Sequence, residues 1–201
     1  FLLGIERNPV IDDPEIASFW EGLPQNLEKL ENVIWAENPA KPGDFGWTMG
    51  GDGISRVWHP GVNEEEKWGW AGAPDIVAEY KGKIVLGDLK TSNGPYYSKW
   101  PGPETPKNQY GMRRAGFMKY QKCQLQLAAY ALGLEHTVNI KPELCMTFVA
   151  TRETVQVFAI QAGTIEKYKQ KWLDTVEKYY SEILPAQKAA ELEMDAQEDK
   201  D

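Results

Sequence analysis

The chain has 201 residues, 42% of them hydrophobic and 26% charged, which is the composition of one globular domain of ordinary size. Its two cysteines exclude a disulfide framework and any four-cysteine centre, so we expect no iron–sulfur cluster. The net charge of −8 disfavours a protein that binds nucleic acid over its whole surface, although a local basic groove remains compatible with it.

The sequence predicts neither a signal peptide at its N-terminal segment nor a membrane span. The N-terminal FLLG is too short for a signal peptide, and no apolar run reaches the roughly 18 residues of a membrane span. We therefore expect no membrane partner and a cytoplasmic location, in a bacterial or phage-infected cell, with the mitochondrial matrix as the alternative.

The first third of the chain has few regular elements. The pattern predicts two short helices within 15–31, broken at Gly22, and then a strand over 32–37. A long irregular region follows over 40–67, rich in Gly and Trp, with a second strand expected within 54–59. A loop of this length inside a compact domain is usually functional or an insertion.

A β-hairpin is the clearest local signal of the sequence. Two strand-like runs, 74–80 and 83–90, flank the two-residue turn Lys81-Gly82. The elements expected after it are a Pro- and Gly-rich loop over 91–109, a helix over 113–132 capped by Gly133, strands over 144–150 and 154–160, and a long helix capped by Thr164. We expect one domain over 1–185 and a solvated acidic tail over 186–201.

The hairpin opposes two carboxylates. If Lys81-Gly82 is the turn, Tyr80 faces Lys83, and counting back along both strands puts Asp75 directly opposite Asp88. Like charges at directly opposed positions destabilise a sheet, and a bound divalent cation is the simplest reason to keep them. Carboxylate oxygens suit Mg²⁺ or Mn²⁺.

A lysine is expected on the same face of this strand. Alternation along the strand places Asp88 and Lys90 on one side, so the ammonium can hold a water or balance charge in a phosphorane-like transition state. An acid-x-Lys triplet is weak by itself, because Glu65-x-Lys67 and Glu79-x-Lys81 also occur. The alternative is an ordinary ion pair at a strand end.

The ordered set resembles the PD-(D/E)XK nuclease superfamily, in particular its RecB-like branch, and is similar to mitochondrial genome maintenance exonucleases and their phage relatives. The matching segments are 70–75 (WAGAPD), 87–92 (GDLKTS) and 126–130 (QLAAY). The resemblance covers roughly residues 15–160 and implies an α/β restriction-endonuclease-like core, in which helices flank a mixed sheet. The family's preceding helix, with a His and a Glu, is expected to be missing from this chain.

The resemblance also implies the metal site. Asp75 and Asp88 would ligate Mg²⁺ or Mn²⁺ together with the Leu89 carbonyl. Glu37, at the end of the strand over 32–37, would sit near the metal. Lys90 would position the attacking water.

A helix is expected to complete the site. By the resemblance, Gln126 contacts the DNA backbone or orients Lys90, and Tyr130 lines the same face one turn later. The spacing agrees, because Lys119, Lys122, Gln126 and Tyr130 fall on one side of a helix. The alternative for Gln126 is a solvent-facing glutamine.

A basic and aromatic segment is the expected substrate path. Six Lys or Arg and one acid, Glu104, lie between Thr91 and Lys122, interleaved with aromatic residues. That mixture fits single-stranded nucleic acid, and the alternative is an aromatic loop packed on the core. The residues we assign to substrate binding are Tyr130, Lys122, Lys119, Arg113, Arg114, Trp100, Tyr97 and Ser92.

The sequence thus predicts a metal-dependent DNA exonuclease that prefers single strands or free ends and works in replication, repair or recombination. A structure-specific or restriction-type endonuclease and a catalytically inactive single-stranded-DNA-binding module remain alternatives. His59 and His136 are expected to lie apart from other ligands, and Cys123 and Cys145 to be buried small residues.

Overall fold

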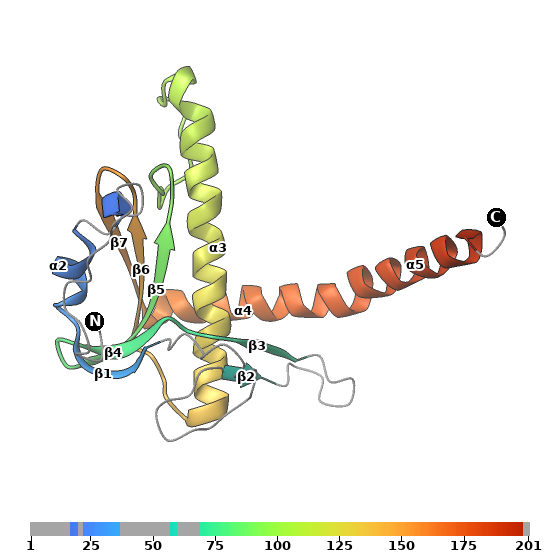
Figure 1. Cartoon of the computed structure of the whole chain (residues 1–201), viewed down its shortest axis with the longest axis horizontal. Coiled ribbons are helices and arrows are strands. Elements are labelled where there is room, and N and C mark those ends of the chain that lie inside the picture. The colour runs from blue at the N-terminus through green and yellow to red at the C-terminus, as the bar shows by residue number, and fades with distance from the viewer. Residues whose placement is uncertain (1–16, 20–21, 37–56, 60–68, 199–201) are drawn as a thin grey trace.

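A mixed five-stranded sheet with helices on both faces forms the body of the protein (Figure 1). The computed structural model describes residues 17–19, 22–36, 57–59 and 69–198. The strand order is β1 (Glu31–Ala36), β4 (Ile76–Tyr80), β5 (Lys83–Thr91), β6 (Leu144–Ala150) and β7 (Val155–Gln161). β5 and β6 pair in parallel and the other neighbours are antiparallel. The expected α/β class with a mixed sheet is confirmed.

The β4–β5 hairpin has the predicted register. Tyr80 pairs with Lys83 and Ile76 pairs with Gly87. Lys81 and Gly82 both have positive φ, 52° and 71°. These are the conformations of the two-residue turns whose twist matches that of paired strands. The turn therefore fixes which residues of β4 and β5 face each other.

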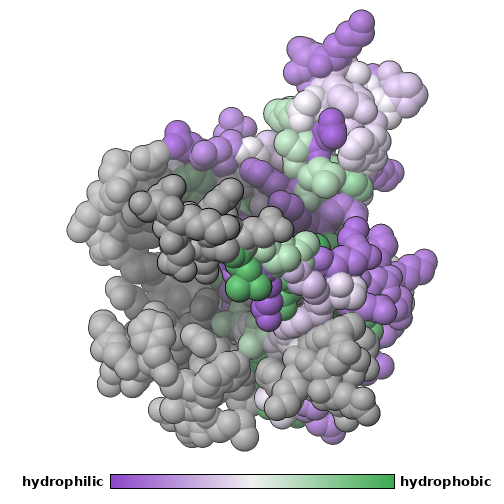
Figure 2. Space-filling view, turned by 90° about the vertical axis from the view of Figure 1, so that its right-hand side faces the viewer, coloured by the Kyte–Doolittle hydropathy of each residue, from purple (hydrophilic) through white to green (hydrophobic). Residues whose placement is uncertain are grey.

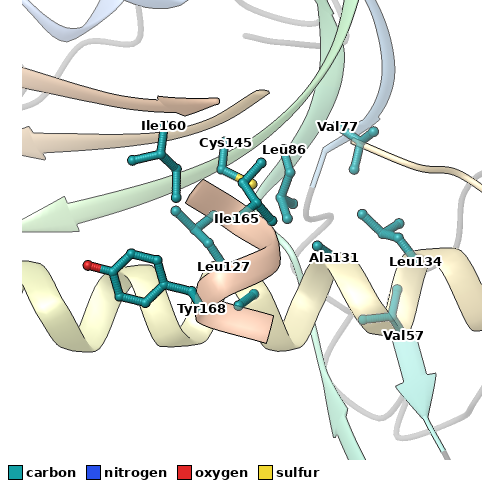
Figure 3. Close-up of a cluster of buried hydrophobic side chains, with 11 residues drawn as sticks. Val57, Val77, Leu86, Leu127, Ala131, Leu134, Cys145, Ile160, Ile165 and Tyr168 are labelled. Atoms are coloured by element: carbon teal, nitrogen blue, oxygen red, sulfur yellow. The ribbon is translucent and has the colours of Figure 1, made fainter. Parts of the chain in front are cut away.

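Helix α3 (Lys107–Val138) covers the sheet face that carries the site. As the crossover between the parallel strands β5 and β6, it packs against Leu86 of β5 through Leu127 and Ala131 (Figure 3). Ile165 and Tyr168 of α4 (Ala162–Lys178) join the same cluster. Alternation along β5 then points Asp88, two residues after Leu86, toward α3.

The opposite sheet face is covered by α2 (Leu23–Leu27), whose N-cap is Gly22. Leu23 and Leu27 pack there against Ile76, Val85 and Phe148. Beside α3 lies a separate two-stranded sheet of β2 (Val57–His59) and β3 (Trp70–Gly72). Of the strand expected within 54–59, the structure describes the last three residues.

Helix α3 is longer than the sequence pattern predicts. It begins at Lys107 rather than 113, and it ends at Val138, capped by Asn139, whose φ is 55° and whose N–H donates to the Leu134 carbonyl. Gly133, expected as the cap, is buried inside the helix. A helical glycine costs only about 1 kcal/mol relative to alanine, so packing of the next residue, Leu134, is sufficient to continue the helix.

The C-terminal helices also differ from expectation. α4 begins at Ala162, so Thr164 lies in its first turn and is not its cap. A π-helical segment, η1 (Tyr179–Ile183), leads into α5 (Leu184–Glu198), so most of the expected solvated tail is helical. In Figure 1 this arm extends away from the sheet. Its sequence is rich in Ala, Glu and Gln, which favour helix without tertiary contacts.

The face of the molecule seen in Figure 2 is mainly polar over the residues that the structure describes. In Figure 2 the coloured atoms are largely hydrophilic, and hydrophobic residues form small separate areas. No helix within the described residues is long and apolar enough to span a membrane.

Candidate active site

The hairpin brings Asp75 to the end of β5. Because Ile76 pairs with Gly87, the same register puts Asp75, one residue earlier, beside Asp88. The Leu89 N–H donates a hydrogen bond to Asp75 Oδ2 at 2.6 Å. This bond ties the carboxylate of one strand to the backbone of the other, so the two acidic residues are held together as predicted.

Asp88 is fully buried and is ion-paired to Lys90. The Lys90 ammonium lies 2.7 Å from both oxygens of the Asp88 carboxylate. Burial by itself lowers the pKa of Lys90, but the attraction of Asp88, and then of Asp75, outweighs it and raises the pKa above its ordinary value. Lys90 is therefore an ammonium at neutral pH and compensates the charge of buried Asp88.

Two further side chains lie close to this ion pair, and spacing along the chain did not predict their position. Cys123 of α3 is buried as expected, and burial followed by the negative charge of Asp88 raises the pKa of its thiol to about 11. The Cys123 side chain lies in one buried cluster with Tyr96, which comes from the loop after β5. The thiol stays protonated at neutral pH and is no nucleophile there.

Gln126 and Tyr130 meet on the helix face where they were expected. Gln126 Nε2 donates to the Tyr130 hydroxyl at 2.7 Å. Burial raises the pKa of Tyr130, the Gln126 hydrogen bond lowers it, and the charge of Asp88 raises it again. The two residues thus form a hydrogen-bonded pair beside the acidic site, rather than two separate solvent-facing side chains.

The donor set fits a hard divalent cation. Asp75 and Asp88 supply only oxygen atoms, and Mg²⁺ is commonly held by one or two carboxylates with water and substrate phosphate. Within the described ranges no cluster of three or more His, Cys, Asp or Glu occurs, and Glu37 lies outside those ranges. Since Lys90 contacts both Asp88 oxygens, a cation bound there requires the ammonium to withdraw.

The basic and aromatic segment lies along the N-terminal half of α3. Lys119 Nζ donates to Ser92 Oγ at 3.2 Å and lies 5.8 Å from the centre of the Tyr96 ring. Ser92 is buried and also donates to the Gly94 carbonyl at 2.8 Å. Ser92 therefore organises the loop after β5, and its assignment to substrate binding stays a prediction.

Arginines of α3 cover two aromatic rings of this loop. Arg113 lies 5.3 Å from the centre of the Tyr97 ring and Arg114 lies 5.8 Å from that of Trp100. Tyr97 packs tightly on Gly116, where an added Cβ would lie 2.7 Å from the ring. Trp100 remains 48% exposed. Of these two rings Trp100 is the more accessible to a ligand.

The two histidines lie next to each other, so the expectation that each lies apart from other ligands is wrong. The ring centroids of His59 and His136 are 5.3 Å apart, and His59 stacks on Trp70 at 4.4 Å with an angle of 12° between the planes. His59 comes from β2 and His136 from the end of α3, so pairing of β2 with β3 beside α3 brings them together. Spacing along the chain could not have shown this.

Comparison with known proteins gives no family for this chain. No family model matches it, and no curated protein matches it. One similar solved structure is described as that of SSO0001, with 14% identity over 53% of this chain and a TM-score of 0.26. The alignment spans 41% of that protein's length, and a likeness this low carries no argument about function.

Proposed function

We propose that this protein is a Mg²⁺- or Mn²⁺-dependent nuclease that hydrolyses DNA from a free end and prefers single strands. One observation carries the proposal: the hairpin register joins Asp75 to Asp88, with Lys90 on the same strand. Two carboxylates beside an ammonium, next to a Gln–Tyr pair, match the PD-(D/E)XK arrangement that the sequence resembles. A role in DNA replication, repair or recombination would follow from this activity.

This mechanism assigns a role to each residue of the candidate site. A metal held by Asp75 and Asp88 would polarise the phosphate and lower the pKa of a bound water. Lys90, freed from its contact with Asp88, would orient the attacking water and offset the charge that develops on the phosphate oxygens. Gln126, held by Tyr130, contacts the DNA backbone from α3.

The proposal is tested with linear and circular single strands labelled at the 5′ or 3′ end. We expect Mg²⁺ or Mn²⁺ to support degradation of linear strands, EDTA to stop it, and circles to resist. Cleavage of circles would instead identify an endonuclease. Binding without cleavage under every metal condition would instead identify an inactive DNA-binding module.

DNA affinity is expected to depend on salt through Arg113 and Arg114. Each phosphate contact to a single strand contributes about 0.7 to the slope of log affinity against log salt, so Arg113→Ala with Arg114→Ala should flatten it by up to about 1.4. The matched control is Lys83→Ala with Lys141→Ala, which removes two exposed charges at the opposite end of the sheet.

Fluorescence anisotropy across a salt series measures both slopes. The control slope should equal that of wild type. If the arginine variant keeps the wild-type slope, DNA does not follow this segment.

A further inference from the structure

A pocket of about 400 Å³ opens beside the candidate active site, between β3, α3 and α4. Its size lies in the roughly 300–1,000 Å³ range of small-ligand sites. Its walls are mostly apolar and aromatic, and a lysine stands at its edge. The lining residues that matter here are Trp70, Lys122, Leu125, Gln126, Tyr130 and Trp172.

The aromatic walls are held in place by contacts with one another and with neighbouring residues. Trp70 Nε1 donates to the Ala129 carbonyl at 3.2 Å, and the His59 ring stacks on the Trp70 ring. Trp172 of α4 meets Trp70 edge-on, with the ring centroids 5.8 Å apart and the planes at 79°. These rings are therefore oriented before any ligand enters, which reduces the entropy cost of binding.

The third aromatic wall depends on a glycine. At Gly72 of β3, an added Cβ would lie 2.3 Å from Tyr130 Cε1, so a residue with a side chain would displace the Tyr130 ring. The WAGAPD segment thus makes two contacts. Gly72 leaves room for the Tyr130 ring, and the Asp75 carboxylate accepts a hydrogen bond from the Leu89 N–H of β5. The Tyr130 hydroxyl, bonded to Gln126, links the pocket to the acidic site.

Shape, charge and position point to one occupant. The aromatic rings offer faces for a planar ring, and exposed Lys122 offers a cation for an attached phosphate. Most of the pocket wall is ring and aliphatic surface, so the walls would contact a base mainly by its face rather than by its edges. A base inside a duplex is not accessible to such a pocket.

We propose that this pocket binds one unpaired base of the DNA strand, next to the phosphate being cleaved, by packing it against Trp70, Trp172 and Tyr130. The inference rests on the proposed nuclease function, and it identifies a contact that holds the DNA strand in the active site. It accounts for a preference for single strands, and it makes binding independent of base identity.

The test is a double-mutant cycle between the DNA and the pocket. Linear strands carry one abasic sugar at each position in turn, and cleavage by wild type in Mg²⁺ is mapped bond by bond. The protein partner is Trp172→Leu, which removes the ring but keeps apolar volume. The matched control, Trp172→Phe, keeps a ring. Thermal unfolding verifies each fold, and Leu125→Trp, which narrows the pocket from α3, replaces Trp172→Leu if that variant does not fold.

In wild type and in Trp172→Phe we expect cleavage about tenfold slower at one fixed offset from the abasic sugar. In Trp172→Leu, intact strands should be cleaved more slowly than by wild type, and the abasic sugar should slow cleavage by clearly less than tenfold, because the contact with the Trp172 ring is lost in both changes. If wild type shows no slower cleavage at a fixed offset from the abasic sugar, or if folded Trp172→Leu shows the same slowing as wild type, the pocket does not bind a base. The proposed nuclease function is unaffected by either result. Absence of cleavage of any DNA by wild type overturns both.

Discussion

Replacing Asp88 with asparagine should lower DNA cleavage by about 10³-fold or more. A metal contributes several kcal/mol to stabilising a phosphoryl transition state, and about 1.4 kcal/mol corresponds to a tenfold change in rate. Asp88 is the fully buried member of the carboxylate pair, so a neutral amide in its place would hold the cation poorly. The measurement is turnover of a labelled single strand, together with Mn²⁺ binding by calorimetry.

The fold should survive this substitution. Asparagine has nearly the same shape, the Lys90 side chain is 25% exposed and can turn to solvent, and like-charge repulsion with Asp75 disappears. Glu143→Gln, an exposed acid at the far end of the sheet, is the matched control and should keep full activity. If Asp88→Asn retains near-normal Mg²⁺-dependent cleavage, Asp88 is not a metal ligand.

The same variant has a signature in the pH dependence of stability. The folded-state pKa of Lys90 is raised, so its ion pair with Asp88 stabilises the metal-free protein. This stabilisation is complete at pH values below the unfolded-state pKa of lysine, and it is lost as the pH rises through the folded-state pKa. The wild type should therefore lose stability in that alkaline range by more than Asp88→Asn does. Thermal unfolding across that range measures the difference.

Replacing Lys90 with alanine should reduce kcat by about 10²–10³-fold and leave KM nearly unchanged. An ammonium that acts on the water and on the developing charge lowers the free energy of the transition state and changes that of the ground state little. Mn²⁺ should bind at least as tightly as in wild type, because the ammonium that contacts both Asp88 oxygens no longer competes for them.

Lys90→Arg is the matched control for charge. Its planar guanidinium keeps the cation but cannot place a single donor as an ammonium does, so activity should recover only in part. A Lys90→Ala variant whose sole defect is a higher KM would make Lys90 a phosphate-contact residue. A variant that loses Mn²⁺ binding would show instead that Lys90 holds the carboxylates in place.

Much of the candidate site could be predicted because its geometry is local. The turn residues Lys81 and Gly82 set the register of β4 and β5, and the register alone puts Asp75 beside Asp88. The period of two along β5 sends Asp88 to the face that Leu86 buries against α3. Helical spacing likewise predicted that Gln126 and Tyr130 share one face.

The rest was decided by packing between distant elements. Cys123 and Tyr96 lie near Asp88, and His59 meets His136, because α3 crosses the sheet between β5 and β6 and β2 lies beside it. The same packing continues α3 through Gly133, where local propensity predicted an end. The sequence by itself determined pairs joined by one turn or one helix. Only the tertiary structure determined the complete burial of Asp88 and the aromatic pocket, because both depend on packing between residues far apart in the chain.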